Sequence, residues 1–83
     1  MKVLYFAWLR ERVGLAEEEV SPPESVRTVA DLAAWLAGRG PGHAHAFEKP
    51  GVVRAALDRR HVKPETLLAG AREVAFFPPM TGG

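Results

Sequence analysis

The stretch "KVLYFAW", residues 2–8, decides how this chain of 83 residues can fold. Its aromatic and β-branched residues are typical of a β-strand, and they predict one from Lys2 to Trp8. Both faces of that strand are apolar, which is typical of a central strand covered on two sides. The stretch "EVAFF", residues 73–77, predicts a second strand that Pro78 ends. If these two strands lie side by side in the middle of one sheet, their alternating residues set its core.

The clearest helix of the sequence follows Thr28, which can cap it with Asp31 at the capping-box position. Apolar residues recur there at helical spacing, and they are Val29, Leu32, Ala33 and Leu36. The other segments predict one helical turn over 9–14, a weak strand over 17–20, a short helix over 43–48, a strand over 52–57, a polar turn over 58–61 and a 3₁₀ turn over 64–68. This order favours an α+β fold, with one mixed sheet of about four or five strands on one main helix.

Strand alternation divides the two central strands into a core face and an open face. The residues expected on the core face are Val3, Tyr5, Val74 and Phe76. The residues expected on the open face are Leu4, Phe6, Ala75 and Phe77. An exposed apolar patch of this kind usually marks an interaction site, so we expect the open face to meet a partner.

The composition narrows the classes of function. The formal charge of +1 gives no electrostatic case for binding nucleic acid or an anionic membrane. No apolar run is long enough to span a membrane and no secretory signal is recognisable, so we expect a cytoplasmic protein. The absence of cysteine excludes thiolate metal sites and a cysteine nucleophile. Asn, Gln and Ile are also missing, which fits a thermophilic source or a GC-rich genome and leaves both open.

Several polar clusters are weak candidates for a site. His43 and His45 could share a strand face and bind a metal, but no third ligand lies nearby in the sequence, and we expect no metal. The segment "DRRH", residues 58–61, more often contacts solvent or a partner than it performs catalysis. Aromatic residues do not interleave with the nearby arginines as a nucleic-acid platform requires. Glu17 to Glu19 is interpreted as a solvated face.

The segment "FFPPMTGG", residues 76–83, is the strongest candidate site. Pro78 and Pro79 favour an extended polyproline II shape, so residues 78–83 are expected to form an extended tail beyond a domain of residues 1–77. Met80 and Thr81 offer side chains to a partner, whereas Gly82 and Gly83 would pass through a narrow tunnel. The reactive group at its end would be the α-carboxylate of Gly83. A carboxylate is a poor acyl donor until it is activated, most economically as a mixed anhydride with a nucleotide phosphate.

Nearly the whole chain resembles the family of ubiquitin-like sulfur carriers that includes the small subunit of molybdopterin synthase and the thiamine-pathway sulfur carrier. The resemblance rests on "EVAFFPPMTGG", residues 73–83, and on "VLYFAWLRERVG", residues 3–14. The helix "TVADLAAWL" and the strand "VRAALDRRHV" fall in the expected order. The Phe-Phe-Pro-Pro segment favours the molybdopterin branch. The resemblance implies a β-grasp fold with a flexible C-terminal tail.

The resemblance also implies a function. An activating enzyme of the E1 type would adenylate Gly83 with ATP and Mg²⁺, and the product would become a thiocarboxylate. The chain, which is not catalytic alone and binds no cofactor itself, would then donate sulfur to cyclic pyranopterin monophosphate in the large synthase subunit, within a heterotetramer. The residues implied in partner contacts are Phe6, Arg10, His61, Phe77, Pro78, Pro79, Met80 and Thr81.

The chain departs from the family pattern at three places outside the tail. Leu57-Asp58 stands where relatives commonly have Val-Asn, and His61 where an apolar contact residue is usual. Ala71-Arg72 replaces a Gly-Asp turn and is one residue longer. The alternatives left open are a related carrier for tRNA thiolation or thiamine synthesis, a ubiquitin-like protein modifier, and an interaction domain with an inert tail.

Overall fold

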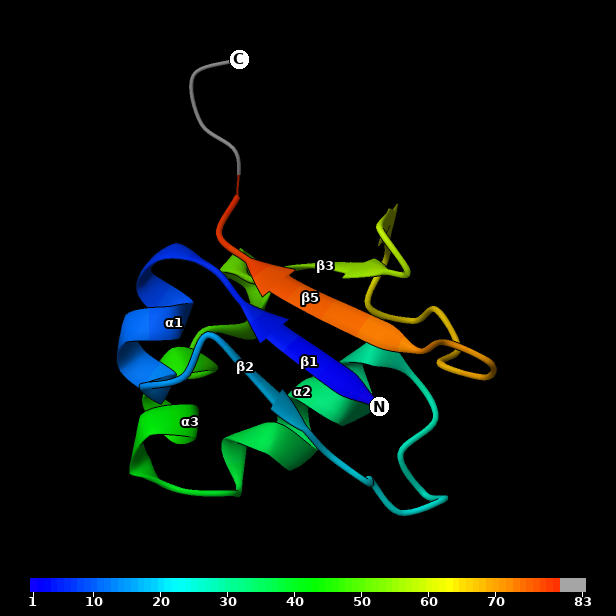
Figure 1. Cartoon of the computed structure of the whole chain (residues 1–83), viewed down its shortest axis with the longest axis horizontal. Coiled ribbons are helices and arrows are strands. Elements are labelled where there is room, and N and C mark those ends of the chain that lie inside the picture. The colour runs from blue at the N-terminus through cyan, green and yellow to red at the C-terminus, as the bar shows by residue number, and fades with distance from the viewer. Residues whose placement is uncertain (80–83) are drawn as a thin grey trace.

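The structure is a computed structural model that describes residues 1–79, with five strands in one mixed sheet and three helices (Figure 1). The strands are β1 (Lys2–Tyr5), β2 (Glu17–Glu19), β3 (Arg54–Leu57), β4 (Arg60–Val62) and β5 (Glu73–Phe77). The helices are α1 (Ala7–Val13), α2 (Val29–Ala37) and α3 (Pro41–Ala46), with a 3₁₀ turn, η1, at Pro50–Val52. The order of strands across the sheet is β2-β1-β5-β3-β4.

The centre of the sheet is the predicted pair of strands. β1 and β5 run parallel, with Val3 opposite Val74 and Tyr5 opposite Phe76. Their outer neighbours, β2 and β3, are antiparallel to them. The first and last strands thus lie side by side, which is the condition on which the expected core face depends.

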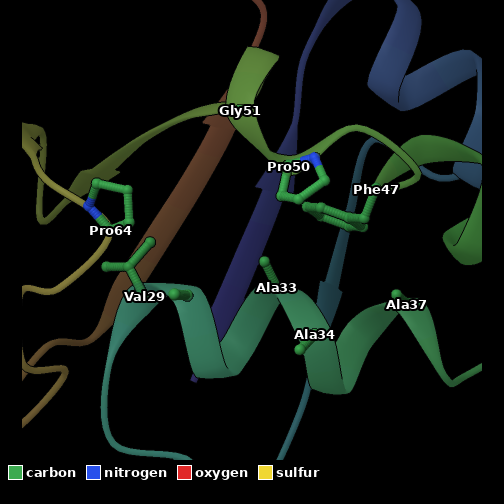
Figure 2. Close-up of a pocket in the computed structure, with 9 residues that line it drawn as sticks. Val29, Ala33, Ala34, Ala37, Phe47, Pro50, Gly51 and Pro64 are labelled. Atoms are coloured by element: carbon green, nitrogen blue, oxygen red, sulfur yellow. The ribbon is translucent and has the colours of Figure 1, made fainter.

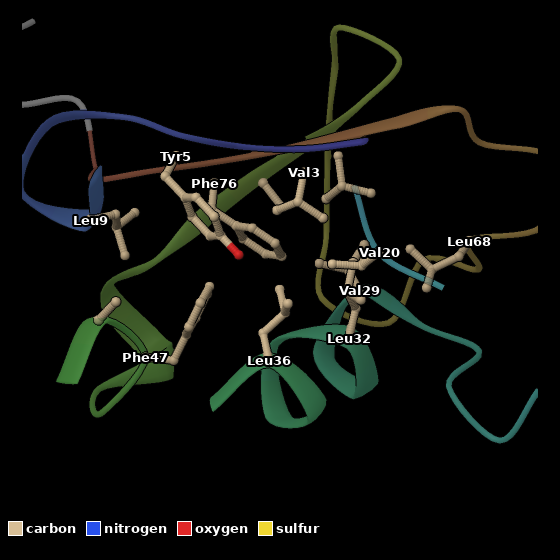
Figure 3. Packing of buried hydrophobic residues seen from close by; sticks show 13 residues of the cluster. Val3, Tyr5, Leu9, Val20, Val29, Leu32, Leu36, Phe47, Leu68 and Phe76 are labelled. Atoms are coloured by element: carbon tan, nitrogen blue, oxygen red, sulfur yellow. The ribbon is translucent and has the colours of Figure 1, made fainter. Parts of the chain in front are cut away.

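The core lies between the sheet and α2 (Figure 3). The predicted core-face residues of β1 and β5 are all at most 1% exposed, and Leu32 and Leu36 of α2 are fully buried against them. Burying a Val, Leu or Phe side chain contributes about 1.5–3 kcal/mol, so this layer is the main source of stability. The arrangement is the ubiquitin-like β-grasp fold that the resemblance implied.

The start of α2 confirms the predicted capping box. The hydroxyl of Thr28 accepts a hydrogen bond from the amide of Asp31 at 3.0 Å, and the Asp31 carboxylate accepts one from the amide of Thr28 at 3.1 Å. The amides of Arg27 and Thr28 stabilise the ionised carboxylate, which lowers the pKa of Asp31. Two otherwise unpaired helix amides are satisfied in this way, so the first turn of α2 is well defined.

The N-terminal prediction was wrong in its boundaries. β1 ends at Tyr5, and Ala7, whose φ is +54°, turns the chain into α1, so Trp8 lies on a helix and not on the strand. One helical turn over 9–14 was predicted, but α1 has seven residues and buries Leu9. The helices α1 and α3 also close the core beside α2, because Leu9 of α1 and Ala46 of α3 are buried in the same hydrophobic cluster.

The second half of the chain also differs in detail. The predicted strand over 52–57 begins two residues later, at Arg54, after η1. The polar turn over 58–61 shrinks to Asp58 and Arg59, because His61 belongs to β4. Within 64–68 no 3₁₀ helix is assigned, but Pro64 and Glu65 form a turn closed by a 3.0 Å hydrogen bond from the amide of Thr66 to the carbonyl of Lys63. Leu67 then makes an isolated bridge with Thr28. The helix predicted over 43–48 lies at Pro41–Ala46, and β2 stops at Glu19.

Candidate functional site

The open face of the sheet carries the predicted apolar patch. Leu4 lies opposite Ala75 in the β1–β5 register, and Phe77 lies opposite Arg54. Phe6, which directly follows β1, is 48% exposed, and its amide donates a 3.1 Å hydrogen bond to the carbonyl of Phe76. We call Leu4, Phe6, Ala75 and Phe77 the open-face patch. The patch therefore sits at the end of the central strands from which the tail departs.

His61 packs against this patch. Its ring lies 4.9 Å from the ring of Phe77, centroid to centroid, with the planes tilted by 44°. His61 is opposite Ala56 in the β3–β4 register, and Ala56 is opposite Ala75, so all three belong to the open face. Ala56 is only 7% exposed although it lies outside the core cluster. The imidazole thus adds to the surface that Phe77 presents.

The segment predicted as a tail follows directly on β5 in the sequence. Pro78 and Pro79 follow Phe77 directly and are half-buried. Figure 1 shows the chain leaving the sheet beyond β5 at the end where β1 enters α1. The predicted tail residues Met80, Thr81, Gly82 and Gly83 lie outside the residues that the structure describes. Arg10 is exposed on α1, the helix that starts next to Phe6.

A polar cluster under the sheet is the feature that the sequence analysis missed. The Tyr5 hydroxyl donates a 2.7 Å hydrogen bond to Oε2 of Glu18, and Nε2 of His43 lies 2.7 Å from the same oxygen. Arg39 approaches the other carboxylate oxygen at 3.9 Å. Glu18 and His43 side chains are only 13% and 14% exposed. The interpretation of Glu17 to Glu19 as a solvated face is therefore wrong for Glu18, because alternation turns it toward the core.

The electrostatics of this cluster favour an ionised carboxylate. Burial opposes the charge on Glu18, but the hydrogen bonds from His43 and Tyr5 and the charge of Arg39 outweigh it and lower the pKa of Glu18. Burial, together with the neighbouring carboxylate, raises the pKa of Tyr5 far above its ordinary value. Tyr5 is thus a neutral hydrogen-bond donor, and the cluster holds β1, β2 and α3 together.

The two histidines predicted as weak metal candidates are engaged separately. His43 contacts Glu18, whereas His45 lies 3.9 Å from Glu48. Within residues 1–79 no group of three or more potential metal ligands is found. Asp58 also has a structural role, since one carboxylate oxygen accepts 3.0 Å hydrogen bonds from the amides of Arg72 and Glu73.

An apolar groove lies between α2 and the loops that face it (Figure 2). Its volume is about 570 Å³, and Phe47, Pro50 and Pro64 face an alanine-rich side of α2 across it. Ionisable side chains are missing from its lining, so the groove offers no group for acid–base chemistry. In the part of the chain that the structure describes, no helix is long and apolar enough to cross a membrane.

Comparison with known proteins decides the family. The model of the ThiS family matches residues 3–83. The chain belongs to the ThiS family. It is 40% identical over 83 residues to the molybdopterin synthase sulfur carrier subunit of Escherichia coli (strain K12), covering 100% of this chain and 99% of the relative. It is 34% identical over 87 residues to the protein of the same name from Haemophilus influenzae, with the same coverage.

Solved structures agree with this assignment to the ThiS family. Molybdopterin converting factor, subunit 1, from Pyrococcus furiosus superposes with a TM-score of 0.76 at 31% identity, over 95% of each chain. SAMP1 from Haloferax volcanii superposes with a TM-score of 0.73 at 25% identity, over 100% of this chain and 98% of that one. The ThiS-family match includes both the open-face patch and the final glycines, so the two parts of the candidate site fall within one family pattern.

Proposed function

We propose that this chain is the sulfur-carrier small subunit of a molybdopterin synthase. The observation that carries the proposal is the segment "FFPPMTGG", which continues the central strand β5 directly and ends in Gly-Gly. The exposed apolar patch beside the start of that segment supports a docking role. Full-length similarity to two sulfur carrier subunits supports the pathway.

The chemistry proposed for the tail takes three steps. A carboxylate oxygen of Gly83 attacks the α-phosphate of ATP on an activating enzyme, and pyrophosphate leaves. A sulfur nucleophile then attacks the acyl carbon and displaces AMP, which yields the thiocarboxylate. Finally the sulfur passes to cyclic pyranopterin monophosphate in the large subunit, and water restores the carboxylate. ATP and Mg²⁺ belong to the activating enzyme in this scheme.

The residues of this chain position the reacting carboxyl and do not catalyse. The open-face patch docks on the partner, and each apolar side chain that is buried there strengthens binding. Pro78 and Pro79 restrict the backbone and direct the tail away from the sheet. Gly82 and Gly83 have no side chains, which permits a close approach of the backbone to a narrow active site.

Two partners follow from this proposal. The first is the large synthase subunit, in a heterotetramer of two small and two large subunits, and the second is the E1-like activating enzyme. Both would use the open-face patch, with Arg10 at its border, so they would bind the carrier in turn. The dithiolene of the product has two sulfur atoms, and each requires one loaded carrier.

A second candidate function is conjugation to proteins. The similarity to SAMP1, whose counterpart structure is named small archaeal modifier protein 1, favours it as the alternative. Both functions would begin with the activation of Gly83. In conjugation, a lysine amine instead of a sulfur nucleophile would then attack the activated acyl carbon. A cell extract supplied with the chain and ATP would then contain lysine-linked adducts.

Activation by the cognate enzyme tests the proposal. The chain is incubated with that enzyme, ATP and a sulfur donor, and the C-terminal peptide is weighed. We expect the mass of Gly83 to change by the substitution of sulfur for oxygen. Gly82→Ala should slow this reaction, whereas Gly51→Ala, a matched change at an exposed glycine with open space around its Cα, should not. The absence of any mass change at Gly83 in the wild type would disprove the proposal.

A further inference from the structure

The β3–β4 hairpin forms a cationic margin along one edge of the open face. Its members are Arg54, Arg59 and Lys63, and all of them are exposed. Arg60 is not a member, because it lies opposite Leu57, which lies opposite the core residue Val74. Within residues 1–79 none of these three side chains forms a salt bridge, and Arg54 donates only to the carbonyl of Gly51, at 3.2 Å. The margin therefore presents several positive charges that the described part of the chain leaves uncompensated.

The tip of this hairpin is held in place. The amide of Asp58 donates a 3.0 Å hydrogen bond to the carbonyl of Glu73, and the Asp58 carboxylate accepts the amides of Arg72 and Glu73. The only acidic side chain of the turn is thus used by backbone amides at the start of β5. Arg59 and Arg60, which follow Asp58, therefore extend from a hairpin whose backbone is held to the start of β5.

The turn also carries an unfavourable backbone conformation. Asp58 and Arg59 have φ values of +46° and +72°, the left-handed region in which hairpin turns normally have Asn-Gly. An arginine at the second position costs free energy that a glycine would not. Turn geometry alone therefore does not explain Arg59.

The opposite edge of the sheet is charged but compensated. On β2, Glu17 pairs with Lys2 at 3.3 Å, and Glu19 pairs with the N-terminal ammonium group at 2.8 Å. Of the two edges of the sheet, as residues 1–79 form it, the β3–β4 edge thus presents positive charge without salt-bridge partners next to the open-face patch. A partner docked on the patch would therefore meet more positive charge at the β3–β4 edge than at the β2 edge. A partner with complementary charge would be oriented by this difference, since charge complementarity specifies orientation more than affinity.

We propose that the cationic margin binds an acidic segment of the large synthase subunit and orients the carrier as its tail enters. This inference rests on the proposed function. The register pairs Arg54 with Phe77, so the margin is continuous with the patch at the point where the tail starts. Of the two partners, the large subunit is the one that holds the carrier while Gly83 meets the pterin. Sulfur transfer there depends most on how the carrier is oriented.

A protein fits the margin better than RNA does. Beside the margin the ring of Phe77 lies 4.9 Å from that of His61, and no Phe, Trp or Tyr stands between the cationic residues of 54–63 as a platform for bases. The formal charge of the whole chain is only +1, and the acidic Glu65 follows the margin closely in sequence. The electrostatic field of the protein therefore attracts a phosphate backbone weakly. Binding to RNA is one of the outcomes of the test.

The test compares two charge-reversal variants of the full chain. One is Arg59→Glu with Lys63→Glu, and the matched control is Arg27→Glu with Lys49→Glu, which makes the same change of charge at exposed sites outside the margin. Binding of each to the purified cognate large subunit is measured kinetically at low and high salt, after thermal unfolding has shown that both fold. Binding to the activating enzyme and to bulk tRNA is measured in parallel.

We expect the margin variant to associate with the large subunit about tenfold more slowly at low salt, and the difference to shrink at high salt. The control should stay within about twofold of the wild type. Equal losses in both variants, a loss insensitive to salt, or a loss confined to the activating enzyme or tRNA would overturn the inference. If the wild type forms a thiocarboxylate and supports product formation while the margin variant binds normally, the inference fails and the proposed function stands. If the wild type does not bind the large subunit at all, both fail.

Discussion

Removal of the Tyr5 hydroxyl should destabilise the fold through Glu18. Tyr5 is 1% exposed, and its hydroxyl and His43 share one carboxylate oxygen of Glu18 at 2.7 Å each. In Tyr5→Phe the ring keeps its packing beside Phe47 and Phe76, whose ring centroids lie 6.3 and 6.4 Å away. The change therefore isolates one hydrogen bond to a partly buried carboxylate.

The magnitude follows from the charge of the acceptor. A hydrogen bond to a charged group contributes about 1.5–3 kcal/mol, and because Glu18 keeps its contact with His43 we expect a loss near the lower end, about 1.5–2 kcal/mol. For a domain of this size that corresponds to a fall in Tm of roughly 6–16 °C.

The pH dependence has a definite sign. The pKa of Glu18 is lowered in the folded state, so the stability that its charge contributes is present above the ordinary pKa of glutamate and is lost as the pH falls through the folded pKa. A protonated Glu18 is a weaker acceptor. The difference between the wild type and Tyr5→Phe should therefore be largest at neutral pH and should shrink in acid.

Denaturant unfolding followed by circular dichroism measures these effects. A cycle of Tyr5→Phe, Glu18→Gln and the double variant reports the coupling between the two side chains. Equal stability of Tyr5→Phe and the wild type at neutral pH, or strictly additive effects in the cycle, would refute the role assigned to the cluster.

Three further predictions concern packing, capping and docking. Gly42→Ala places a Cβ 2.6 Å from the carbonyl oxygen of Arg12, so α1 and α3 must move apart. The free energy of unfolding should therefore fall by about 1–3 kcal/mol in a denaturant titration. If Gly42→Ala changes stability no more than Gly51→Ala does, the close contact is contradicted. Thr28→Ala removes the cap of α2 and should cost about 1 kcal/mol in the same assay, with loss of helical ellipticity as the thermal midpoint is approached. Phe6→Ser should change the free energy of unfolding by no more than about 0.5 kcal/mol, since Phe6 is 48% exposed and Ser suits its N-cap position. Calorimetry should show at least about tenfold weaker binding of this variant to the large subunit. Unchanged binding would exclude Phe6 from the interface.

Local patterns predicted the parts of the fold that depend on neighbouring residues. The alternation in 2–5 and 73–77 assigned the two faces of the central strands, and Thr28 with Asp31 marked the start of α2. The end of β1 could not be found in this way, because Ala7 and Trp8 continue the apolar strand pattern. The chain turns there through the positive φ of Ala7, which the packing of Leu9 beneath the sheet stabilises.

The site shows the same division. Alternation indicated the open-face patch, but the contact of His61 with Phe77 depends on the register of three strands. The burial of Glu18 had a usable signal, because it alternates with Glu17 and Glu19 and so faces the core side with Val3. Its partner His43 lies 25 residues away, and only the packing of α3 brings them together. The pairing therefore needed the structure.

Sulfur transfer in a defined mixture tests the central claim most directly. The chain is loaded as the thiocarboxylate, mixed with the cognate large subunit and cyclic pyranopterin monophosphate, and followed by mass spectrometry of both the carrier and the pterin. The account predicts that the dithiolene product forms while Gly83 returns to the carboxylate, with two loaded carriers consumed for the two sulfur atoms of each product. A thiocarboxylate that binds the large subunit and keeps its sulfur in the presence of the pterin would contradict the account.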